Sequence, residues 1–593
     1  MAIKRQRIVA DFETTTDEND VRVWAVCAVD IDTGDVVHLG NNIADFIEWL
    51  SDLNTVCYFH NLKFDISFVL DYLMKEKGFK YSTSHEAGTI ETLITDRGVF
   101  YSVTAYFAKK NKTYKKCVFY DSLKKLPFSV ATISKAFELK DEKLTIDYDA
   151  PRPVGHVLTA EERAYVINDC RIVAEALRIQ MAEGLTKMTN ASDAMAGYKD
   201  IISKNQFEYL YPTFPIEMDD DIRRAYKGGF VWLKPEHQNK RGLEGITLDV
   251  NSLYPSVMYD CLLPYGYPRY FEGEPEEDKK YPLFIVRMEC AFELKPGHIP
   301  TIQLKNNRWY VETEYLTSSR AKGEDHLKIV ELTLTNVDLQ LFKDHYNIYN
   351  PKYISGWRFR GAKGLFTEYI DKWMAVKENN TGAKRQLAKL QLNSLYGKFA
   401  TSVKGGKKVP YVEDDVIKYK DSDPADEKHP RQPVYTAMGA FITAYAREKT
   451  IRSGQQVYDR FIYADTDSLH LIGTEPPEGL DVHPTRLGAW KNEGVFTDSK
   501  YIRAKTYMET VYTVKKDTLE NYCILMQGAE WIRREPDGIH CGLAKVTCAG
   551  MPANVKKYVT YDNFHPGSTF EGKLMPKRVP GGMILKETTF TIK

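Results

Sequence analysis

A single hydrophobic core cannot accommodate the whole of this chain. It has 593 residues, and folded chains longer than about 250–300 residues usually divide into several packed units. Hydrophobic residues make up 43% and charged residues 27% of the sequence, as in ordinary globular proteins, so no long disordered tract is expected. The sequence therefore predicts a globular protein of three or more units.

Net charge does not by itself predict a nucleic-acid partner. The chain has 81 Lys and Arg against 81 Asp and Glu, so nucleic-acid binding would have to rely on local concentrations of positive charge. One such concentration is a glycine-containing run with Lys404, Lys407 and Lys408, although runs of this kind are more often solvated loops.

Cysteine spacing and hydropathy disfavour several classes of protein. None of the nine cysteines forms a Cys-x-x-Cys pair, which disfavours a zinc site and a disulfide framework. No stretch reaches about 18 consecutive apolar residues, and charged residues interrupt the N-terminus early. We therefore expect a cytosolic protein without a signal peptide or a membrane span.

The first third begins with a carboxylate pair on a predicted strand. Residues 8–13 form a short apolar run that ends in Asp11 and Glu13, and a second β-rich run at residues 21–29 predicts a hairpin. Residues two apart on a strand point to the same side, so both carboxylates could hold Mg²⁺ or Mn²⁺, which prefer oxygen ligands. Taken alone, the pair is more often two exposed strand residues.

Two more acidic residues are predicted on helices. Asp65 lies at a strand-to-helix junction, where Asp often serves only as an N-cap. Thr159 and Glu162 have the form of a capping box, and the helix after them places Tyr165 and Asp169 on one face. An Asp in so apolar a helix is costly unless it is paired or metal-bound. With the first pair, these residues make four carboxylates and a tyrosine, which match a two-metal hydrolytic site.

A second group of acidic residues lies downstream. A predicted strand at residues 246–248 leads into Asp249, and residues 461–471 form a predicted hairpin with Asp465 and Asp467 at its tip. An acidic hairpin tip alone is usually a solvated turn. Nucleotidyl transfer, however, needs two metal ions held by carboxylates on adjacent strands, so the combination predicts a second metal site.

Between these motifs, residues 384–397 have a strong helical pattern. Four polar residues share one stripe of this helix, namely Arg385, Lys389, Asn393 and Tyr396. A cationic stripe is often only a solvated face, but this one also carries an aromatic ring and could bind phosphate together with a base or sugar. The turn at residues 379–382 predicts an antiparallel partner helix that ends near Lys377.

These motifs resemble those of known enzymes. The upstream set, with Tyr165, resembles the DEDD proofreading 3′–5′ exonucleases of ribonuclease H-like fold. The downstream set resembles family B DNA polymerases, with Asp-x-x-Ser-Leu-Tyr-Pro at residues 249–255, Lys-x-x-x-Asn-Ser-x-Tyr-Gly at 389–397 and Tyr-x-Asp-Thr-Asp-Ser at 463–468. Tyr-x-Gly-Gly at residues 226–229 resembles the linker of the protein-primed bacteriophage branch, the phi29-like polymerases. The resemblance implies a strand-displacing, processive DNA-directed DNA polymerase with a proofreading exonuclease.

The resemblance also implies roles for individual residues. The implied catalytic residues and metal ligands of the exonuclease are Asp11, Glu13, Asp65 and Asp169, with Lys143 and Tyr165 as further catalytic residues. Those of the polymerase are Asp249, Val250 and Asp467, with Asp465 either a ligand or a close neighbour. Nucleotide contacts are implied for Tyr254, Lys377, Arg385, Lys389, Asn393 and Tyr396. DNA contacts are implied for Asn61, Ser122, Leu123, Phe128, Tyr226, Gly228, Gly229, Ser252, Lys404, Lys407, Lys408, Thr443, Arg447, Lys505 and Tyr507.

The resemblance further implies an α/β multidomain (α+β) architecture, in which a right-hand polymerase of palm, fingers and thumb follows the ribonuclease H-like domain. The expected parts are the exonuclease (1–190), palm (191–260 and 435–530), first insertion (261–358), fingers (359–400), second insertion (401–434) and thumb (531–593). The first insertion would contact a priming protein. The second would separate strands ahead of synthesis, with its own strands expected at residues 410–416 and 417–419.

Cofactors and partners follow from the same resemblance. Two Mg²⁺ ions are expected at each site, with Mn²⁺ as a substitute. The expected partners are primer-template DNA, single-stranded DNA, deoxynucleoside triphosphates and a terminal priming protein, for a monomer in the cytoplasm of a phage host. Two other interpretations are a nuclease with a polymerase-like scaffold and a non-catalytic single-strand-binding protein. The complete acidic set around Asp249 disfavours the first, and only the basic and aromatic runs favour the second.

Overall fold

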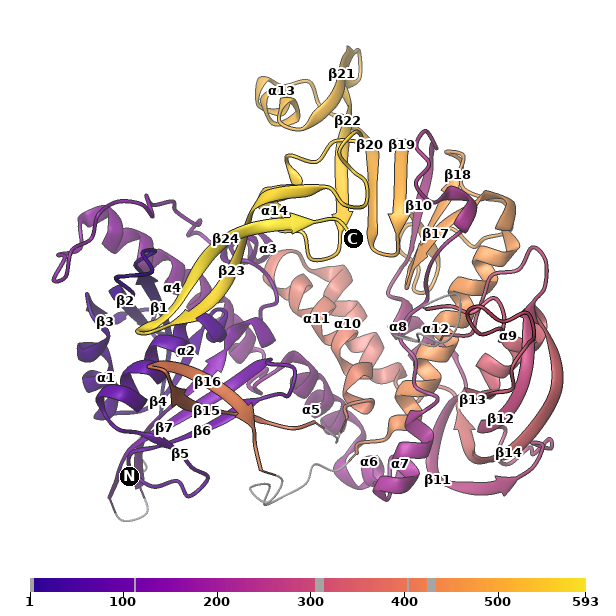
Figure 1. The fold of residues 1–593 in the computed structure, drawn as a ribbon, viewed down its shortest axis with the longest axis horizontal. Coiled ribbons are helices and arrows are strands. Elements are labelled where there is room, and N and C mark those ends of the chain that lie inside the picture. Colours follow the sequence, from indigo (N-terminus) through magenta and orange to yellow (C-terminus); the bar gives the residue numbers. More distant parts are fainter. Residues whose placement is uncertain (1–4, 111–112, 304–313, 403–404, 424–432) are drawn as a thin grey trace.

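The computed structural model describes residues 5–110, 113–303, 314–402, 405–423 and 433–593. The N-terminal part of the chain forms one α/β body, and the rest forms a second body around another sheet (Figure 1). A long pair of strands near the C-terminus, drawn in yellow, reaches from the second body across to the first (Figure 1). This arrangement confirms the prediction of a multidomain α/β protein.

The first sheet has eight strands in the order β3-β2-β1-β4-β8-β7-β6-β5. The pairs β1·β4, β4·β8 and β5·β6 are parallel, and the other neighbours are antiparallel. The bounds are β1 (Gln6–Thr14), β2 (Val23–Asp30), β3 (Val36–Gly40), β4 (Asn54–Phe59), β5 (Lys80–Tyr81), β6 (Thr89–Ile94), β7 (Phe100–Lys110) and β8 (Thr113–Asp121). The expected hairpin at the start of the sheet is therefore present as β1 and β2.

Helices cover both faces of this sheet because successive residues of β1 point to opposite sides. Val9 packs with the long helix α4, whereas Ile8 and Ala10 pack with α1 and α2. The bounds are α1 (Ile43–Ser51), α2 (Leu62–Asp71), the π-helical turn η1 (Tyr72–Glu76), the 3₁₀ turn η2 (Ser122–Lys124), α3 (Val130–Phe137) and α4 (Ala160–Ala182). The result is a three-layer α/β/α unit in which the ends of β1, α2 and α4 meet.

The second sheet also has eight strands, in the order β21-β22-β20-β19-β10-β18-β17-β9. The bounds are β9 (Val231–Leu233), β10 (Gly245–Val250), β17 (Phe461–Asp465), β18 (Ser468–Ile472), β19 (Trp490–Arg503), β20 (Thr506–Lys515), β21 (Ala529–Glu535) and β22 (Gly538–Cys548). Strand β22 pairs with β20 over its whole length. The sheet therefore continues past residue 530, where the palm was expected to end.

Helices connect and cover this second sheet. Their bounds are α5 (Asn190–Ile202), α6 (Lys204–Leu210), α7 (Ile216–Arg223), η3 (Pro235–His237), α8 (Leu253–Asp260), α12 (Thr436–Gln456), η5 (Tyr458–Arg460), α13 (Leu519–Met526) and α14 (Ala553–Lys556). Helix α12 is buried along most of its length and contacts both α8 and the β17–β18 hairpin. The strands that carry Asp249 and Asp467 thus rest on a fixed support.

The expected fingers and insertions appear as separate elements. The segment expected to form the fingers contains the paired helices α10 (Thr367–Asn379) and α11 (Gly382–Phe399), joined by the predicted turn. The segment expected to be the first insertion forms a sheet in the order β11-β14-β12-β13 with one helix. Its bounds are β11 (Leu263–Glu272), β12 (Leu283–Leu294), β13 (Val330–Thr335), α9 (Asn336–His345) and β14 (Tyr346–Ala362).

The second insertion forms a hairpin whose turn differs from the prediction. Its strands are β15 (Lys408–Glu413) and β16 (Val416–Asp421), and Glu413 pairs with Val416. The expected strand boundary after residue 416 is therefore wrong. Asp414 and Asp415 both adopt positive φ, 52° and 59°, which suits a two-residue hairpin turn and is a conformation that Asp tolerates better than most residues.

Two hairpins that are distant in sequence converge on the first unit (Figure 1). Ile417 of β16 joins the core around α1 and α2, and so does Met583 of β24. The C-terminal pair consists of β23 (Thr569–Val579) and β24 (Gly582–Thr591). Its turn reaches α2, where the Gly581 backbone N–H donates to Asp71 Oδ1 at 3.3 Å.

Within the described parts of the chain, no helix is long and apolar enough to span a membrane.

Candidate active sites

The structure brings the four acidic residues of the first predicted site to one end of β1. Asp11 and Glu13 lie on β1, Asp65 on the first turn of α2 and Asp169 on α4. Burial, followed by the negative charge of Asp169, raises the pKa of Asp11 to about 7. Burial and the Asp11 charge raise the pKa of Glu13 to about 9. The carboxylates therefore repel one another where little water screens them.

A lysine and two tyrosines complete this site. Lys143 Nζ donates to Asp169 Oδ2 and, at 3.1 Å, to the Tyr165 hydroxyl. The Tyr148 hydroxyl lies 2.6 Å from the Tyr165 hydroxyl. Sequence reasoning missed Tyr148, because it lies in an irregular segment with no periodic pattern. The structure thus places Lys143 and Tyr165 beside the carboxylates, as the resemblance implied.

The donor set of this site fits divalent cations. Asp169 Oδ1 is buried and has no hydrogen-bond partner among the described residues. Burial also raises the pKa of Asp65, and the Asp11 charge adds to that effect. One lysine cannot neutralise four carboxylates, so the arrangement is electrostatically unfavourable until cations are bound.

The DNA-contact residues predicted for the first unit lie next to this site, but not all of them are accessible. Ser122 is fully buried, donates to the Phe59 carbonyl at 3.1 Å and lies 2.8 Å from His60 Nδ1. His60 Nε2 lies 2.8 Å from the Phe128 carbonyl oxygen. The Ser122 hydroxyl is therefore used internally, and direct DNA contact by this side chain stays a prediction. Asn61 is exposed at the start of α2.

The second acidic site lies where β10 meets the β17–β18 hairpin. Asp249 is opposite Ser468 in the sheet, and the Val250 backbone N–H donates to the Asp467 carbonyl at 2.8 Å. Burial and the Asp467 charge raise the pKa of Asp249 to about 7. Burial, followed by the Asp465 charge, raises the pKa of Asp467. The structure therefore brings Asp249, near the end of β10, next to Asp467 in the β17–β18 turn.

Asp465 has a different environment. Both of its carboxylate oxygens accept from Lys505 Nζ at 2.7 Å, and the Tyr463 hydroxyl donates to Oδ2 at 3.2 Å. The Lys505 backbone N–H in turn donates to the Tyr463 hydroxyl at 2.9 Å. Tyr507 stacks on the buried ring of Tyr501 under this tip. These contacts favour the alternative in which Asp465 is a close neighbour of the metal ligands.

The predicted nucleotide-binding residues meet between α8 and the fingers. The rings of Tyr254 and Tyr396 are stacked, with centroids 3.9 Å apart and planes inclined by 17°. Lys377 Nζ donates to Ser252 Oγ at 3.0 Å. Burial, followed by the charges of Arg385 and Lys389, lowers the pKa of Lys377. Three cations are therefore close together beside a stacked aromatic pair, while Asn393 is exposed on the same helix.

The Tyr-x-Gly-Gly segment packs against the acidic hairpin tip. A Cβ atom at Gly229 would lie 2.5 Å from Thr466 Oγ1, so no side chain fits there without a shift of the hairpin. The Thr466 backbone N–H donates to the Phe230 carbonyl at 2.6 Å. The segment therefore fixes the turn between the two aspartates, a role that its glycines serve by permitting close approach.

Thr443 and Arg447 both lie inside the structure. Thr443 is buried and donates to carbonyl groups of its own helix. Arg447 is also buried, forms a two-pronged ion pair with Asp338 of the first insertion and donates to the carbonyl of Gly228 at 2.9 Å. The polar groups of both side chains are therefore satisfied internally, and their contact with DNA stays a prediction.

Two of the three predicted DNA-contact lysines of the second insertion make contacts within the protein. Lys404 lies outside the described residues. Lys408 Nζ pairs with Asp421 at 2.9 Å, and the Lys408 carbonyl accepts from Thr92 Oγ1 at 3.0 Å. Lys407 forms an isolated β-bridge with Thr95. These contacts attach the insertion to the edge strands of the first sheet.

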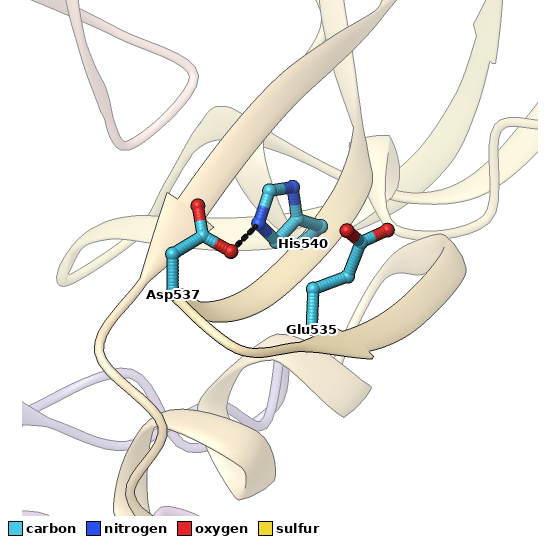
Figure 2. Close-up of side chains that lie close together, drawn as sticks. All are labelled: Glu535, Asp537 and His540. Carbon is cyan, nitrogen blue, oxygen red and sulfur yellow. Dashed lines mark hydrogen bonds and ion pairs between the residues drawn. The ribbon is translucent and has the colours of Figure 1, made fainter.

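A third set of potential metal ligands lies at the tip of the β21–β22 hairpin. Figure 2 shows Glu535, Asp537 and His540, whose ligand atoms lie within 4.8 Å of one another. His540 Nε2 is 2.6 Å from Asp537 Oδ1, and its Nδ1 contacts the Tyr512 hydroxyl. Both carboxylates are exposed, and both ring nitrogens of His540 already have hydrogen-bond partners. We therefore interpret the group as a hydrogen-bonded cluster on the surface and not as a metal site.

Comparison with known proteins assigns the family. The family model for DNA polymerase type B, organellar and viral, matches residues 50–156 and 149–483. A DNA polymerase of Bacillus phage B103 is 46% identical over 99% of this chain and 100% of its own length. The chain belongs to the type B DNA polymerases. Within them it is a phi29-like phage polymerase, so it is a DNA-directed enzyme that binds and replicates DNA.

Other relatives support the same assignment. The DNA polymerase of Bacillus phage phi29 is 45% identical over 99% of both chains. The solved structure titled phi29 DNA polymerase complexed with primer-template DNA has a TM-score of 0.91, 43% identity, and covers 99% of this chain and 100% of that chain. DNA polymerases use divalent metal ions, which agrees with the acidic residues at both sites of this polymerase.

The raised pKa values predict a stability cost in the absence of metal. An acid with a raised pKa in the folded state binds its proton more tightly there than in the unfolded chain, so its contribution to stability falls as pH rises from about 4 towards its folded pKa. In EDTA at pH 8, the Asp11→Asn/Glu13→Gln variant should be more stable than the wild type by about 1–3 kcal/mol, measured by thermal unfolding.

The stabilisation should shrink at pH 5, where the wild-type acids bind protons, and Mg²⁺ should restore stability to the wild type more than to the variant. The exposed Asp52 provides a control, because Asp52→Asn should show neither effect. A double variant that is less stable than the wild type at pH 8 without metal would contradict the electrostatic argument.

Proposed function

We propose that this polymerase also degrades single-stranded DNA from the 3′ end, at the site around Asp11, and so removes misincorporated nucleotides. The observation that carries the proposal is a cluster of four carboxylates with raised pKa values. Asp65 and Asp169 are buried, Asp11 and Glu13 are half-buried, and Asp169 Oδ1 has no hydrogen-bond partner among the described residues. This cluster is built on the first sheet and shares no residue with the acidic site on the second sheet. The two reactions therefore use separate sets of ligands.

Synthesis is assigned to Asp249 and Asp467, which would hold two Mg²⁺ ions that Mn²⁺ could replace. When bound, the ions activate the primer 3′-hydroxyl and stabilise charge on the triphosphate. Lys377, Arg385 and Lys389 bind the phosphates of the incoming nucleotide, because three cations close together offset its negative charge.

The stacked pair Tyr254 and Tyr396 forms the floor of the nucleotide pocket. A flat ring beneath the sugar leaves little room for a 2′-hydroxyl, which would favour deoxynucleotides. Lys505 binds the primer strand near its end, and its contact with Asp465 keeps it next to the reaction centre in the absence of DNA.

For excision, four residues would hold metal ions: Asp11, Glu13, Asp65 and Asp169. The ions would supply an activated water and stabilise charge on the leaving oxygen. Tyr165 orients the water through its hydroxyl. Lys143 fixes Asp169 and Tyr165 by donating to both. The hydroxyl of Tyr165 acts by hydrogen bonding, since burial strongly raises its pKa and keeps it protonated.

The two activities should separate by mutation. Asp249→Asn should lower nucleotide incorporation by more than about 100-fold and leave excision of a labelled 3′ end intact. Asp11→Ala with Glu13→Ala should do the opposite, and mismatched 3′ ends should then persist. Gel assays of extension and excision on the same preparations measure both rates. Loss of both activities in either folded variant would contradict the assignment of two sites.

The second insertion is proposed to separate strands ahead of synthesis and to keep the enzyme on its template. Its hairpin lies against the first unit, and Arg578 of the C-terminal hairpin stacks over Tyr419 at 4.6 Å. Parting a duplex costs about 1.4 kcal/mol per base-pair step, and a barrier that passes only the template strand couples this cost to translocation.

Replacing residues 406–422 with a short glycine-serine linker tests this role. Gap filling should be retained, whereas synthesis should stop at a downstream duplex and products should shorten when free enzyme is trapped after one binding event. The extension rate on single-stranded template serves as the internal control. Unchanged displacement in this variant would remove the assignment.

A terminal protein is proposed as primer, with the first insertion as part of its contact surface. Arg447 links this insertion to the polymerase core through Asp338, so a protein bound there sits close to the acidic hairpin. Such a protein should receive the first nucleotide on a Ser, Thr or Tyr hydroxyl, detected as labelled protein with a labelled nucleotide. The polymerase is proposed to act as a monomer in the host cytoplasm.

A further inference from the structure

The segment between α3 and α4 reaches the proposed exonuclease site without any regular structure. Residues 138–159 contain no helix or strand, yet Lys143 and Tyr148 both contact the Tyr165 hydroxyl. Backbone ladders therefore cannot fix the position of these two side chains. Some other set of interactions must hold the segment against the carboxylates.

Arg152 supplies most of these interactions. It is 8% exposed and donates to three backbone carbonyls of its own segment, those of Asp147 at 2.7 Å, Ala150 at 3.0 Å and Tyr148 at 3.4 Å. Its guanidinium group also stacks over Trp24, 4.0 Å from the ring centroid. The planar, five-donor guanidinium can serve all these acceptors at once, which a lysine cannot.

Glu162 anchors the arginine to α4. Arg152 Nε donates to Glu162 Oε1 at 2.9 Å, and His156 Nε2 lies 2.7 Å from Oε2. Glu162 also closes the capping box, since its Oε2 accepts from the Thr159 backbone N–H at 2.9 Å. Although burial raises its pKa, these hydrogen bonds outweigh that effect and lower the pKa to about 2.

The position of Glu162 makes it a link between two parts of the site. It lies in the first turn of α4, the helix that also carries Tyr165 and Asp169. Through Arg152 it therefore ties the start of this helix to the irregular segment with Lys143 and Tyr148. Lys143 and Tyr148 come from the irregular segment, whereas Tyr165 comes from α4. The distances between these side chains therefore depend on the link between Arg152 and Glu162.

We propose that Arg152 and Glu162 are positioning residues for 3′–5′ excision, which hold Tyr148 and Lys143 against Tyr165. They act through the geometry of the irregular segment and touch neither metal ligands nor DNA. This inference rests on the proposed exonuclease function and adds a requirement to it. The polymerase site lies on the other sheet, so loss of the link should leave synthesis unchanged.

Two conservative substitutions test the link. Arg152→Lys keeps the positive charge but loses the planar guanidinium group with its several donors. Glu162→Gln keeps an acceptor for the Thr159 N–H but loses the ion pair with Arg152. Single-turnover excision of a labelled single-stranded oligonucleotide should slow by about 10- to 100-fold in each variant. The enzyme concentration that gives half the maximal excision rate should change less than the excision rate constant itself. The rate of primer extension should equal that of the wild type.

A double-mutant cycle distinguishes positioning from a general loss of stability. If the link acts through the Tyr148–Tyr165 contact, adding Tyr148→Phe to Glu162→Gln should cause little further loss, because the contact is already disturbed. Ile47→Val provides the control, since Ile47 is buried in α1 on the opposite face of the same sheet. It should lower the unfolding temperature without slowing excision.

Several outcomes would overturn the inference. Wild-type excision rates in both conservative variants would show that the link is dispensable. If the rate losses of Glu162→Gln and Tyr148→Phe multiplied fully in the double variant, Arg152 and Glu162 would be only an ordinary buried ion pair. The same conclusion would follow if Ile47→Val slowed excision in proportion to its loss of stability. If the wild type itself excised no faster than Asp11→Ala with Glu13→Ala, the exonuclease proposal would fail first and the inference with it.

Discussion

Both acidic sites depend on the same unfavourable interaction, the mutual repulsion of carboxylates that little water screens. Burial raises the pKa of Asp11 and of Asp249 to about 7, and neighbouring acids add to the effect at each site. Such clusters persist only where the surrounding structure fixes the side chains and where cations can bind. Each sheet therefore serves one requirement, which is to bring an acidic strand beside acidic residues of neighbouring helices or of a neighbouring turn.

One set of contacts between the two bodies lies at the end of α2. Asp71, at the end of α2, accepts from the Gly581 backbone N–H of the C-terminal hairpin turn. Lys75, on the π-helical turn that follows, pairs with Asp71 at 3.3 Å and with Asp415 of the second insertion at 2.8 Å. Two hairpins of the second body thus meet at the end of α2 and on the turn that follows it. These contacts join parts of the chain that are distant in sequence, so no local sequence pattern would reveal them.

Sequence reasoning predicted best where a motif coincides with a regular element. Asp11 and Glu13 on β1, the capping box of α4 and the paired fingers helices are present as expected, because strand alternation and helical spacing determine them locally. Contacts that depend on tertiary packing could not be predicted in the same way. Thr443 and Arg447 point inward because their helix is buried, and no local pattern encodes that orientation. Tyr148 and Arg152 lie in a segment without periodicity, so no pattern could identify them.

The buried Arg447 illustrates why the polymerase part behaves as one structure despite its insertions. Asp338 lies in the first turn of α9, the helix of the first insertion, and its backbone N–H donates to the N-cap residue Thr335. Arg447 pairs with Asp338 and also donates to the carbonyls of Lys227 and Gly228, the two residues before Gly229. Gly229 then lies against Thr466, between the two aspartates of the hairpin. A chain of close contacts therefore leads from the insertion to the reaction centre. Because Arg447 and Asp338 are buried and paired, a shift at one end of this chain of contacts would break hydrogen bonds. The insertion is therefore constrained to share the geometry of the active site.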